Sequence, residues 1–294
     1  MNSLTRLILF NRPVVRKVLH TSYRGHVYQQ DQRSGYPVVY DRPPKKDNSN
    51  FLQKAMKGYS QLKEELALFK KETNDIIAGP DLFQQPDEID IVWDFNGNQK
   101  SLDPWLTVSD KDYKQGYSTC KLELSPDGRA VFSGILDCRV PKTGKIHNAG
   151  YCAIKTATFR KSFKREGRLN WQSYNHLVMR IRGDGRIYMI NIGNKGHFDI
   201  FWNDLYNYVL CTRGGPYWQF VKIPFSKFFL SSHGRVQDTQ QPIDLTNISS
   251  FGIIASDRAP GPFKLEIDYI GLVYDPYEWE EFAYETYDLH DILF

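Results

Sequence analysis

The chain has 294 residues, of which 41% are hydrophobic and 14% aromatic, so it can bury a large core without a metal or disulfide framework. Its formal net charge is +4, but residues 1–24 contribute five positive charges, which leaves the remainder at about −1. A nucleic-acid-binding domain usually presents a basic face, so this balance argues against nucleic acid as a partner. No apolar stretch reaches the roughly 20 residues of a membrane-spanning helix, so none is predicted.

Residues 1–24 are the most distinctive segment. They hold five basic residues and no acidic one, and Asp31 is the first carboxylate. Their leucine, isoleucine and valine residues recur at spacings that place them on one face of a helix. A basic, amphipathic, acid-free N terminus is typical of a mitochondrial transit peptide, and a disordered basic tail or a surface helix on a cytosolic protein is the alternative. We therefore expect a mitochondrial protein.

Residues 25–50 are rich in Gly, Pro and polar residues and predict a disordered linker. A helical pattern follows over residues 51–79 and stops at Gly79-Pro80. Its apolar stripe consists of Phe51, Leu52, Ala55, Met56, Tyr59, Leu62, Leu66 and Phe69. No other helical pattern follows the predicted transit peptide, so this stripe must lie on its own domain, on a partner or on a membrane surface.

Residues 80–275 show the alternating pattern of β-strands. Ten segments predict strands: 89–95, 117–124, 129–136, 151–158, 175–182, 186–193, 205–211, 217–223, 251–255 and 263–274. Turn sequences such as Pro-Asp-Gly at 126–128 and Gly-Asp-Gly at 183–185 separate them, because Gly and Asp tolerate positive φ. Many short strands with few helices predict an all-β sandwich or jelly roll.

Residues 276–294 form an acidic-aromatic tail. The last twenty residues hold seven acidic residues and no Lys or Arg, interleaved with aromatic and aliphatic side chains. Such a segment is unlike a merely solvated tail. We expect it either to pack back on the sandwich or to dock on a basic partner surface.

Motifs that carry catalysis are absent from the sequence. There is no P-loop, GxSxG, HExxH or nucleotide-binding glycine motif. The cysteines at 120, 138, 152 and 211 form no CxxC pair, so we interpret these four cysteines as core or strand residues. Asp94 and Asp268 could converge as a glycosidase pair, but ordinary surface placement explains them as well. We predict no catalytic residue, no cofactor and no metal. Gly183, Asp184 and Gly185 are interpreted as a structural turn, and positive φ at both glycines would make valine destabilising there.

The same turn lies inside the most diagnostic stretch. Residues 174–193, YNHLVMRIRGDGRIYMINIG, closely resemble the signature of the complex I intermediate-associated protein family, mitochondrial assembly factors of the respiratory NADH:ubiquinone oxidoreductase. Four further stretches match in the family's order: WDF at 93–95, YWQFVKIPFSKF at 217–228, FGIIASD at 251–257 and LEIDYIGLVYD at 265–275. The resemblance thus covers most of the predicted sandwich.

The resemblance implies a galactose-binding-like jelly roll, similar to carbohydrate-binding modules. It also implies a non-catalytic chaperone that holds membrane-arm intermediates of complex I, located in the matrix and peripheral to the inner membrane. Its expected partners are an acyl-CoA-dehydrogenase-like flavoprotein, an adaptor protein and small integral membrane proteins. The alternative is a carbohydrate-binding-like module or another ligand-binding β-sandwich, because exposed Trp and Tyr rings can stack on sugars.

Aromatic side chains are the candidate partner-binding residues, since they supply much of the binding energy at protein interfaces. The candidates are Trp202, Tyr206, Tyr208 and Trp218, near the loops of residues 194–218, and Tyr277, Trp279 and Phe282 in the tail. Each of them singly is more often a core residue than an interface anchor. Their combination with an unpaired amphipathic helix favours a protein-binding role for the set.

Overall fold

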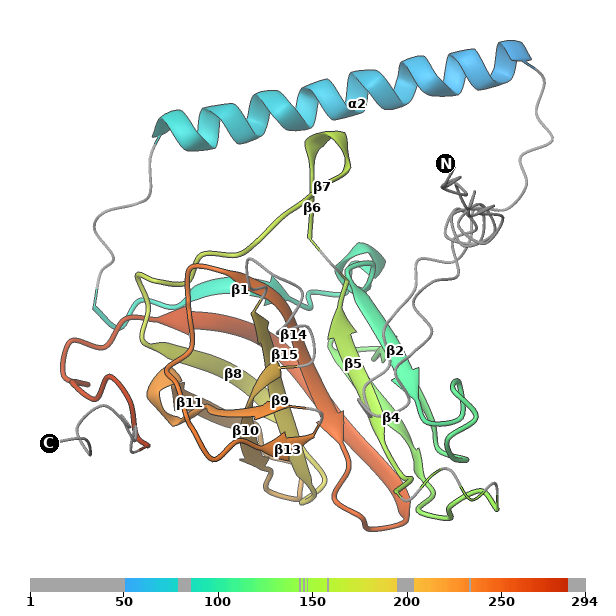
Figure 1. The fold of residues 1–294 in the computed structure, drawn as a ribbon, viewed down its shortest axis with the longest axis vertical. Coiled ribbons are helices and arrows are strands. Elements are labelled where there is room, and N and C mark those ends of the chain that lie inside the picture. The colour runs from blue at the N-terminus through green and yellow to red at the C-terminus, as the bar shows by residue number, and fades with distance from the viewer. Residues whose placement is uncertain are drawn as a thin grey trace, which may run out of the picture.

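The computed structural model describes residues 51–78, 86–142, 144, 146, 148–157, 159–194, 204–232 and 234–284. The predicted transit peptide at 1–24 and the linker at 25–50 lie outside these residues, as do Trp202 and the last ten residues of the tail. Within the described chain, two antiparallel sheets pack face to face and one long helix lies beside them (Figure 1).

The first sheet has the strand order β11-β8-β15-β4-β3, and β1 also pairs with β15. Its members are β1 (Asp90–Asp94), β3 (Thr119–Leu124), β4 (Ala130–Leu136), β8 (His176–Arg182), β11 (Gln219–Pro224) and β15 (Gly261–Val273). The 13-residue β15 is long enough to pair with two strands along one edge. β4 pairs with residues 261–267 and β1 with residues 269–272, while β8 occupies the opposite edge.

The second sheet has the order β13-β12-β10-β9-β14-β5-β2. Its members are β2 (Trp105–Ser109), β5 (Cys152–Thr156), β9 (Ile187–Asn194), β10 (Asp204–Cys211), β12 (Phe229–Ser232), β13 (Arg235–Val236) and β14 (Ile248–Ala255). A separate hairpin of β6 (Arg160–Lys161) and β7 (Arg165–Glu166) projects from the sandwich. Three 3-10 turns complete the described elements: η1 (Gln99–Leu102), η2 (Ser162–Lys164) and η4 (Phe225–Lys227).

The core lies between the two sheets because alternate residues of each strand face inward. On β8, Leu177, Met179 and Ile181 are completely buried, and Arg180 between them is only half-buried on the outer face. One end of the core is aromatic. Its centre is Trp93, whose ring lies 5.2 Å from Phe251, and 5.5 and 6.2 Å from the rings of Trp105 and Trp171. Aromatic pairs of this kind stabilise a core by about 0.5–1.5 kcal/mol each beyond their buried area.

The observed architecture confirms the predicted all-β jelly-roll sandwich. Each of the ten predicted strands overlaps an observed one, with ends that differ by up to three residues. The two-residue strands β6, β7 and β13 were not predicted, and neither were β2 and β12. Both are short, with five and four residues, and β2 begins directly after Pro104, so neither shows an alternating pattern long enough to recognise.

Helix α2 (Phe51–Ala78) crosses above the sandwich and meets it at the tip of the β6–β7 hairpin (Figure 1). Its 28 residues follow the predicted 51–79 range. The helix lies clear of both sheet faces in this view. Among the described residues, no helix is long and apolar enough to cross a bilayer.

Candidate interaction surfaces

Helix α2 contacts the sandwich through acidic side chains. The Glu72 carboxylate accepts hydrogen bonds from the Ser162 N–H at 2.6 Å and from the Ser162 hydroxyl at 3.0 Å. It also pairs with the Arg165 guanidinium at 2.6 Å. Glu65 accepts the N–H of Phe163 at 2.5 Å. The hydrogen bond from the Ser162 N–H is the main reason that the pKa of Glu72 lies below its ordinary value.

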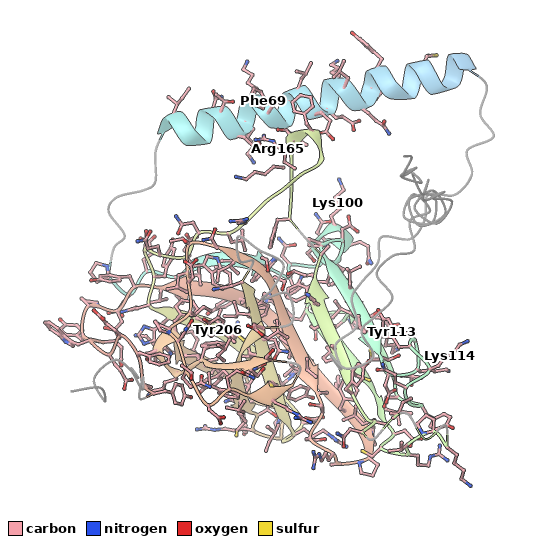
Figure 2. All side chains as sticks on the ribbon, in the orientation of Figure 1. Phe69, Lys100, Tyr113, Lys114, Arg165 and Tyr206 are labelled. Carbon is pink, nitrogen blue, oxygen red and sulfur yellow. The ribbon has the colours of Figure 1, made fainter. Side chains whose placement is uncertain are left out.

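The hairpin tip is shaped to receive these carboxylates. Phe163 adopts φ 57° and ψ 36°, so η2 presents the successive N–H groups of Ser162 and Phe163 to the helix. Successive N–H groups in a turn of this kind form a concave anion-binding site. The Phe69 ring adds an edge contact to the Phe163 ring at 5.9 Å, and the Arg165 guanidinium lies 5.9 Å from the Phe69 ring (Figure 2).

Most of the apolar stripe of α2 is left uncovered by this docking. Glu65 is half-buried, whereas the adjacent Leu66 is 51% exposed. Tyr59 and Leu62 of the same stripe are 72% and 50% exposed. A surface helix normally buries its apolar stripe and exposes its charges. The helix is thus held by its polar edge, with its apolar stripe available to another surface.

The tail provides a second exposed apolar group. Tyr277 and Trp279 are 81% and 85% exposed, although the segment that carries them is fixed on both sides. On one side the N–H of Tyr277 donates to Asp275, which pairs with Lys222 at 2.5 Å. On the other side the Ala283 N–H donates to the Ser226 carbonyl at 3.1 Å.

The end of the described tail packs back on the sandwich. Phe282 contacts the Tyr284 ring at 5.6 Å, and Tyr284 contacts Phe229 of β12 at 6.5 Å. The Tyr284 hydroxyl donates to the Lys227 carbonyl at 2.9 Å. Tyr284 therefore attaches the tail to the sandwich, with the half-buried Phe282 packed against it, while Tyr277 and Trp279 remain exposed.

Trp218 lies on the outer face of the first sheet, beside a ladder of paired charges. The guanidinium carbons of Arg180 and Arg182 lie 5.2 and 5.0 Å from its ring centroid. Such cation–π contacts contribute about 0.5–1 kcal/mol at exposed sites. Arg180 and Arg129 both pair with Asp268, and Arg182 and Lys264 both pair with Glu266. The six charged groups of this ladder leave a surplus of positive charge.

Asp268 is 3% exposed and paired with two guanidinium groups, so it is unsuited to the acid–base role considered for it together with Asp94.

Two of the other candidate aromatics lie in or against the core. Tyr206 is 8% exposed, and its hydroxyl donates to the Pro242 carbonyl at 3.1 Å (Figure 2). Burial raises the pKa of Tyr206 to about 12. Tyr208 is half-buried, with its ring 5.6 Å from that of Phe228. Trp202 lies outside the described residues. Tyr206 and Tyr208 stabilise the sandwich, and their part in partner binding stays a prediction.

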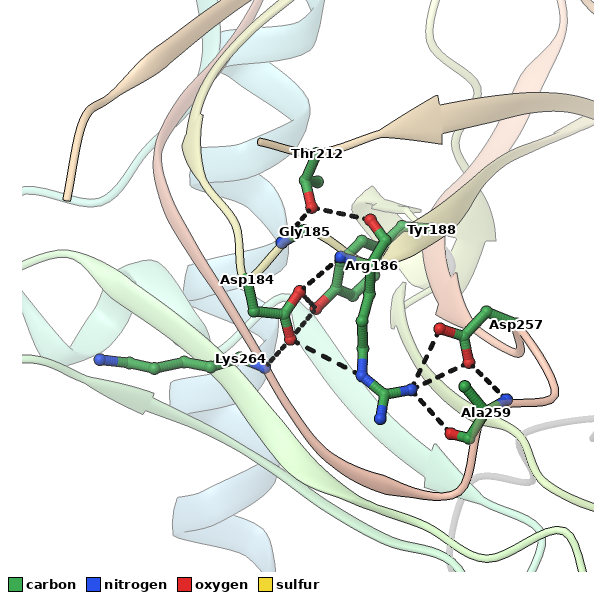
Figure 3. Close-up of polar contacts among 8 residues, drawn as sticks. All are labelled: Asp184, Gly185, Arg186, Tyr188, Thr212, Asp257, Ala259 and Lys264. Atoms are coloured by element: carbon green, nitrogen blue, oxygen red, sulfur yellow. Dashed lines mark hydrogen bonds and ion pairs between the residues drawn. The ribbon is translucent and has the colours of Figure 1, made fainter. Parts of the chain in front are cut away.

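The Gly183-Asp184-Gly185 turn is the centre of a polar network that joins four segments (Figure 3). Asp184 accepts the Arg186 N–H at 3.1 Å, the Lys264 N–H at 2.7 Å and the Tyr188 hydroxyl at 3.2 Å. The Thr212 hydroxyl accepts the Gly185 N–H and donates to the Arg186 carbonyl. Hydrogen bonds at these positions hold the β8–β9 turn against β15 and the end of β10.

Arg186 extends the network to the loop between β14 and β15. Its guanidinium donates to both oxygens of Asp257 at 3.0 Å and to the Ala259 carbonyl at 2.7 Å (Figure 3). The side chains of Asp184 and Arg186 are thus both engaged by structural partners. The arrangement supports the interpretation of Gly183, Asp184 and Gly185 as a structural turn.

The expectation of positive φ at both turn glycines holds at only one of them. Gly185 has φ +90°, whereas Gly183 is not in that region. Gly183 is needed for space, because a Cβ at this position would lie 2.3 Å from the Cβ of Thr212. Sequence reasoning identified the residue type that the turn needs but could not see the Thr212 side chain packed against it.

Sequence reasoning missed the docking hairpin of α2. In the sequence, the basic residues of this region resemble an ordinary solvated loop: Arg160, Lys161, Lys164, Arg165 and Arg168. The signal that could have identified the contact is the acidic pair Glu65 and Glu72, seven residues apart on one helix face. Within the described part of the chain, no group of three His, Cys, Asp or Glu side chains is placed to hold a metal ion.

The fold and these surfaces define a jelly-roll β-sandwich protein with an appended amphipathic helix and an aromatic tail. The family model of Complex I intermediate-associated protein 30 (CIA30) matches residues 93–267. The chain therefore belongs to the CIA30 family.

The chain is also similar to curated relatives and, more distantly, to solved structures. The mitochondrial Complex I intermediate-associated protein 30 of Drosophila melanogaster is 46% identical over 94% of this chain and 92% of its own length. The Mus musculus protein of the same name is 46% identical over 67% of this chain and 60% of its own length. A family 11 carbohydrate-binding module from Clostridium thermocellum, solved with a mixed-linked tetrasaccharide, is 18% identical with a TM-score of 0.43 over 64% of this chain and 96% of the module.

Proposed function

We propose that this chain is a non-catalytic assembly factor of mitochondrial complex I, which binds and stabilises intermediates of the membrane arm. Support comes from its membership of the CIA30 family and from the names of its relatives, which describe mitochondrial proteins associated with complex I intermediates. The basic, acid-free residues 1–24 fit the same compartment. The proposed place of action is the matrix side of the inner membrane.

The observation that carries the mechanism is the uncovered stripe of α2. Tyr59, Leu62 and Leu66 are exposed on a helix that the hairpin holds by Glu65 and Glu72. Association with an incomplete membrane-arm intermediate would bury this stripe against apolar surface that later subunits cover in the mature enzyme. The sandwich acts as a rigid support and needs no reaction of its own.

The tail and the first sheet supply further contacts in this proposal. Backbone hydrogen bonds hold the segment that carries Tyr277 and Trp279 on both sides, so less backbone entropy is lost when a partner covers these exposed rings. The positive surplus around Trp218 suits acidic segments of a partner. The companions proposed for the assembly complex are an acyl-CoA-dehydrogenase-like flavoprotein, an adaptor protein and small integral membrane proteins.

Depletion of the protein tests the function. Mitochondria that lack it should lose mature complex I and accumulate a membrane-arm subassembly on native gels. Re-expression of the full chain should restore the mature enzyme. A normal amount of complex I after complete depletion would refute the proposal.

A further inference from the structure

Two cysteines from opposite sheets lie together at one side of the sandwich. Cys120 is on β3, the edge strand of the first sheet, and Cys152 begins β5, next to the edge strand β2 of the second sheet. The Cys120 thiol donates to the Val108 carbonyl of β2 at 3.4 Å, and Val108 pairs with Ala153, the neighbour of Cys152 on β5. Both cysteine side chains pack in the core between the two sheets. Both are free in this structure.

The two thiols differ in access to solvent. Cys120 is half-buried, while Cys152 is completely buried. The hydrogen bond from Cys152 lowers the pKa of Cys120 below its ordinary value, and the same contact raises the pKa of Cys152. Because the thiolate is the nucleophile, Cys120 is the thiol that an oxidant would reach and react with first.

We propose that Cys120 and Cys152 are a redox pair, which hydrogen peroxide converts into a reversible disulfide that joins the two sheets. The Cys120 thiolate attacks one peroxide oxygen, so an S–O bond forms, the O–O bond breaks, and the leaving oxygen takes a proton to become water. The Cys152 sulfur then attacks the Cys120 sulfur, and the hydroxyl leaves as a second water with the Cys152 proton. Two electrons pass from the two sulfurs to the peroxide.

The other two cysteines are less suited to this reaction. Cys211 is exposed on β10 of the second sheet, three strands away from β5 in the strand order. Cys138 follows β4 and lies against Gly150, where a Cβ would be 2.9 Å from its sulfur. It is therefore the nearest competing thiol and Cys211 is a matched control.

Peptide mapping of the full-length protein tests the proposal. The reduced protein is treated with increasing hydrogen peroxide, its remaining thiols are blocked with N-ethylmaleimide, and it is digested and analysed by mass spectrometry without reduction. The expected product is a Cys120–Cys152 peptide pair that disappears on treatment with dithiothreitol. Cys211→Ser should leave its yield unchanged, and Cys152→Ser should leave Cys120 as a sulfenic acid that dimedone captures.

A melting measurement provides a second result that does not depend on the Cys152 variant folding. Oxidation should raise the Tm of the wild-type protein, because the bond restricts the unfolded chain, and should leave the Tm of Cys120→Ser unchanged. Linkage of Cys120 to Cys138, or irreversible oxidation of Cys120 in the wild type without any cross-link, would overturn the proposal.

Discussion

At the residue scale, the turn at 183–185 shows how two glycines serve different physical needs. Gly185 is required by its φ of +90°, whereas Gly183 is required because Thr212 leaves no room for a Cβ. Thr212 also bonds both the Gly185 N–H and the Arg186 carbonyl, so it cannot move away without loss of these hydrogen bonds.

Substitutions at the two glycines should therefore separate the two causes. Gly183→Val and Gly185→Val should each lower the free energy of unfolding by about 1–2 kcal/mol or more, measured by urea denaturation. Gly185→Asn should cost less than Gly185→Val, because Asn adopts positive φ more readily. Equal unfolding midpoints for the wild type and both valine variants would show that the turn does not constrain these positions.

A second prediction concerns Glu266, which is 6% exposed between Lys264 and Arg182. Burial alone would raise its pKa, but hydrogen bonds from Lys264 and Arg182 outweigh burial and hold the pKa below the usual 4.5. Because the folded pKa is the lower one, the stabilisation is present above the unfolded pKa and is lost as the pH falls through the folded value.

The wild type should consequently lose more free energy of unfolding than Glu266→Gln when the pH is lowered from about 6 to about 3. Urea denaturation at each pH measures this difference. Glu123→Gln, at an exposed position of the same sheet, is the matched control. Parallel pH profiles for the wild type and Glu266→Gln would contradict the assignment.

At the element scale, helix α2 is held by few contacts. Its carboxylates Glu65 and Glu72 bond the Ser162 and Phe163 N–H groups, and one aromatic contact accompanies them. The helix is therefore expected to have its own local stability, distinct from that of the sandwich.

Neutralising the two carboxylates should release the helix. In Glu65→Gln with Glu72→Gln, the amides of Ser162 and Phe163 should exchange faster with solvent, because neutral amide oxygens are weaker acceptors than carboxylates. Hydrogen exchange followed by mass spectrometry measures this, with Glu64→Gln on the exposed helix surface as the matched control. Unchanged exchange in the double variant would mean that other contacts hold the hairpin to the helix.

Gly58 offers an independent test of the helix itself. It lies in the helix interior, and a Cβ there would meet no atom within 4 Å. Gly58→Ala should stabilise α2 by about 1 kcal/mol, because Gly loses more backbone entropy than Ala in a helix. Slower amide exchange over residues 56–64 is the expected result. Faster exchange there would show that the segment is not an intact helix.

At the scale of the whole molecule, the repeated alternation of apolar residues was enough to predict the sandwich. Residues such as Leu177, Met179 and Ile181 bury because one strand face must be covered, and this pattern is visible in the sequence. The helix was predictable from the helical spacing of its apolar residues, and its end at Ala78 from the Gly79-Pro80 pair that follows.

Contacts between distant segments were not predictable in this way. The docking of Glu72 on Ser162 joins residues 90 positions apart, and the approach of Cys120 to Cys152 depends on how the sheet edges align. The partner-binding set shows the same limit. The sequence places Tyr206 on a predicted strand and Trp279 in the acidic tail, but it does not show that the first is buried and the second exposed.

A pull-down from mitochondria measures whether the uncovered stripe of α2 binds the membrane-arm intermediate. Leu62→Glu with Leu66→Glu places two negative charges on the stripe, whereas Ser60→Glu with Lys71→Gln changes the net charge by the same amount on the opposite face of the helix. We predict that the leucine variant folds, fails to retain membrane-arm subunits and does not restore complex I in depleted cells. The control variant should retain these subunits and restore complex I. Full retention of these subunits by the folded leucine variant would show that the stripe does not bind the intermediate.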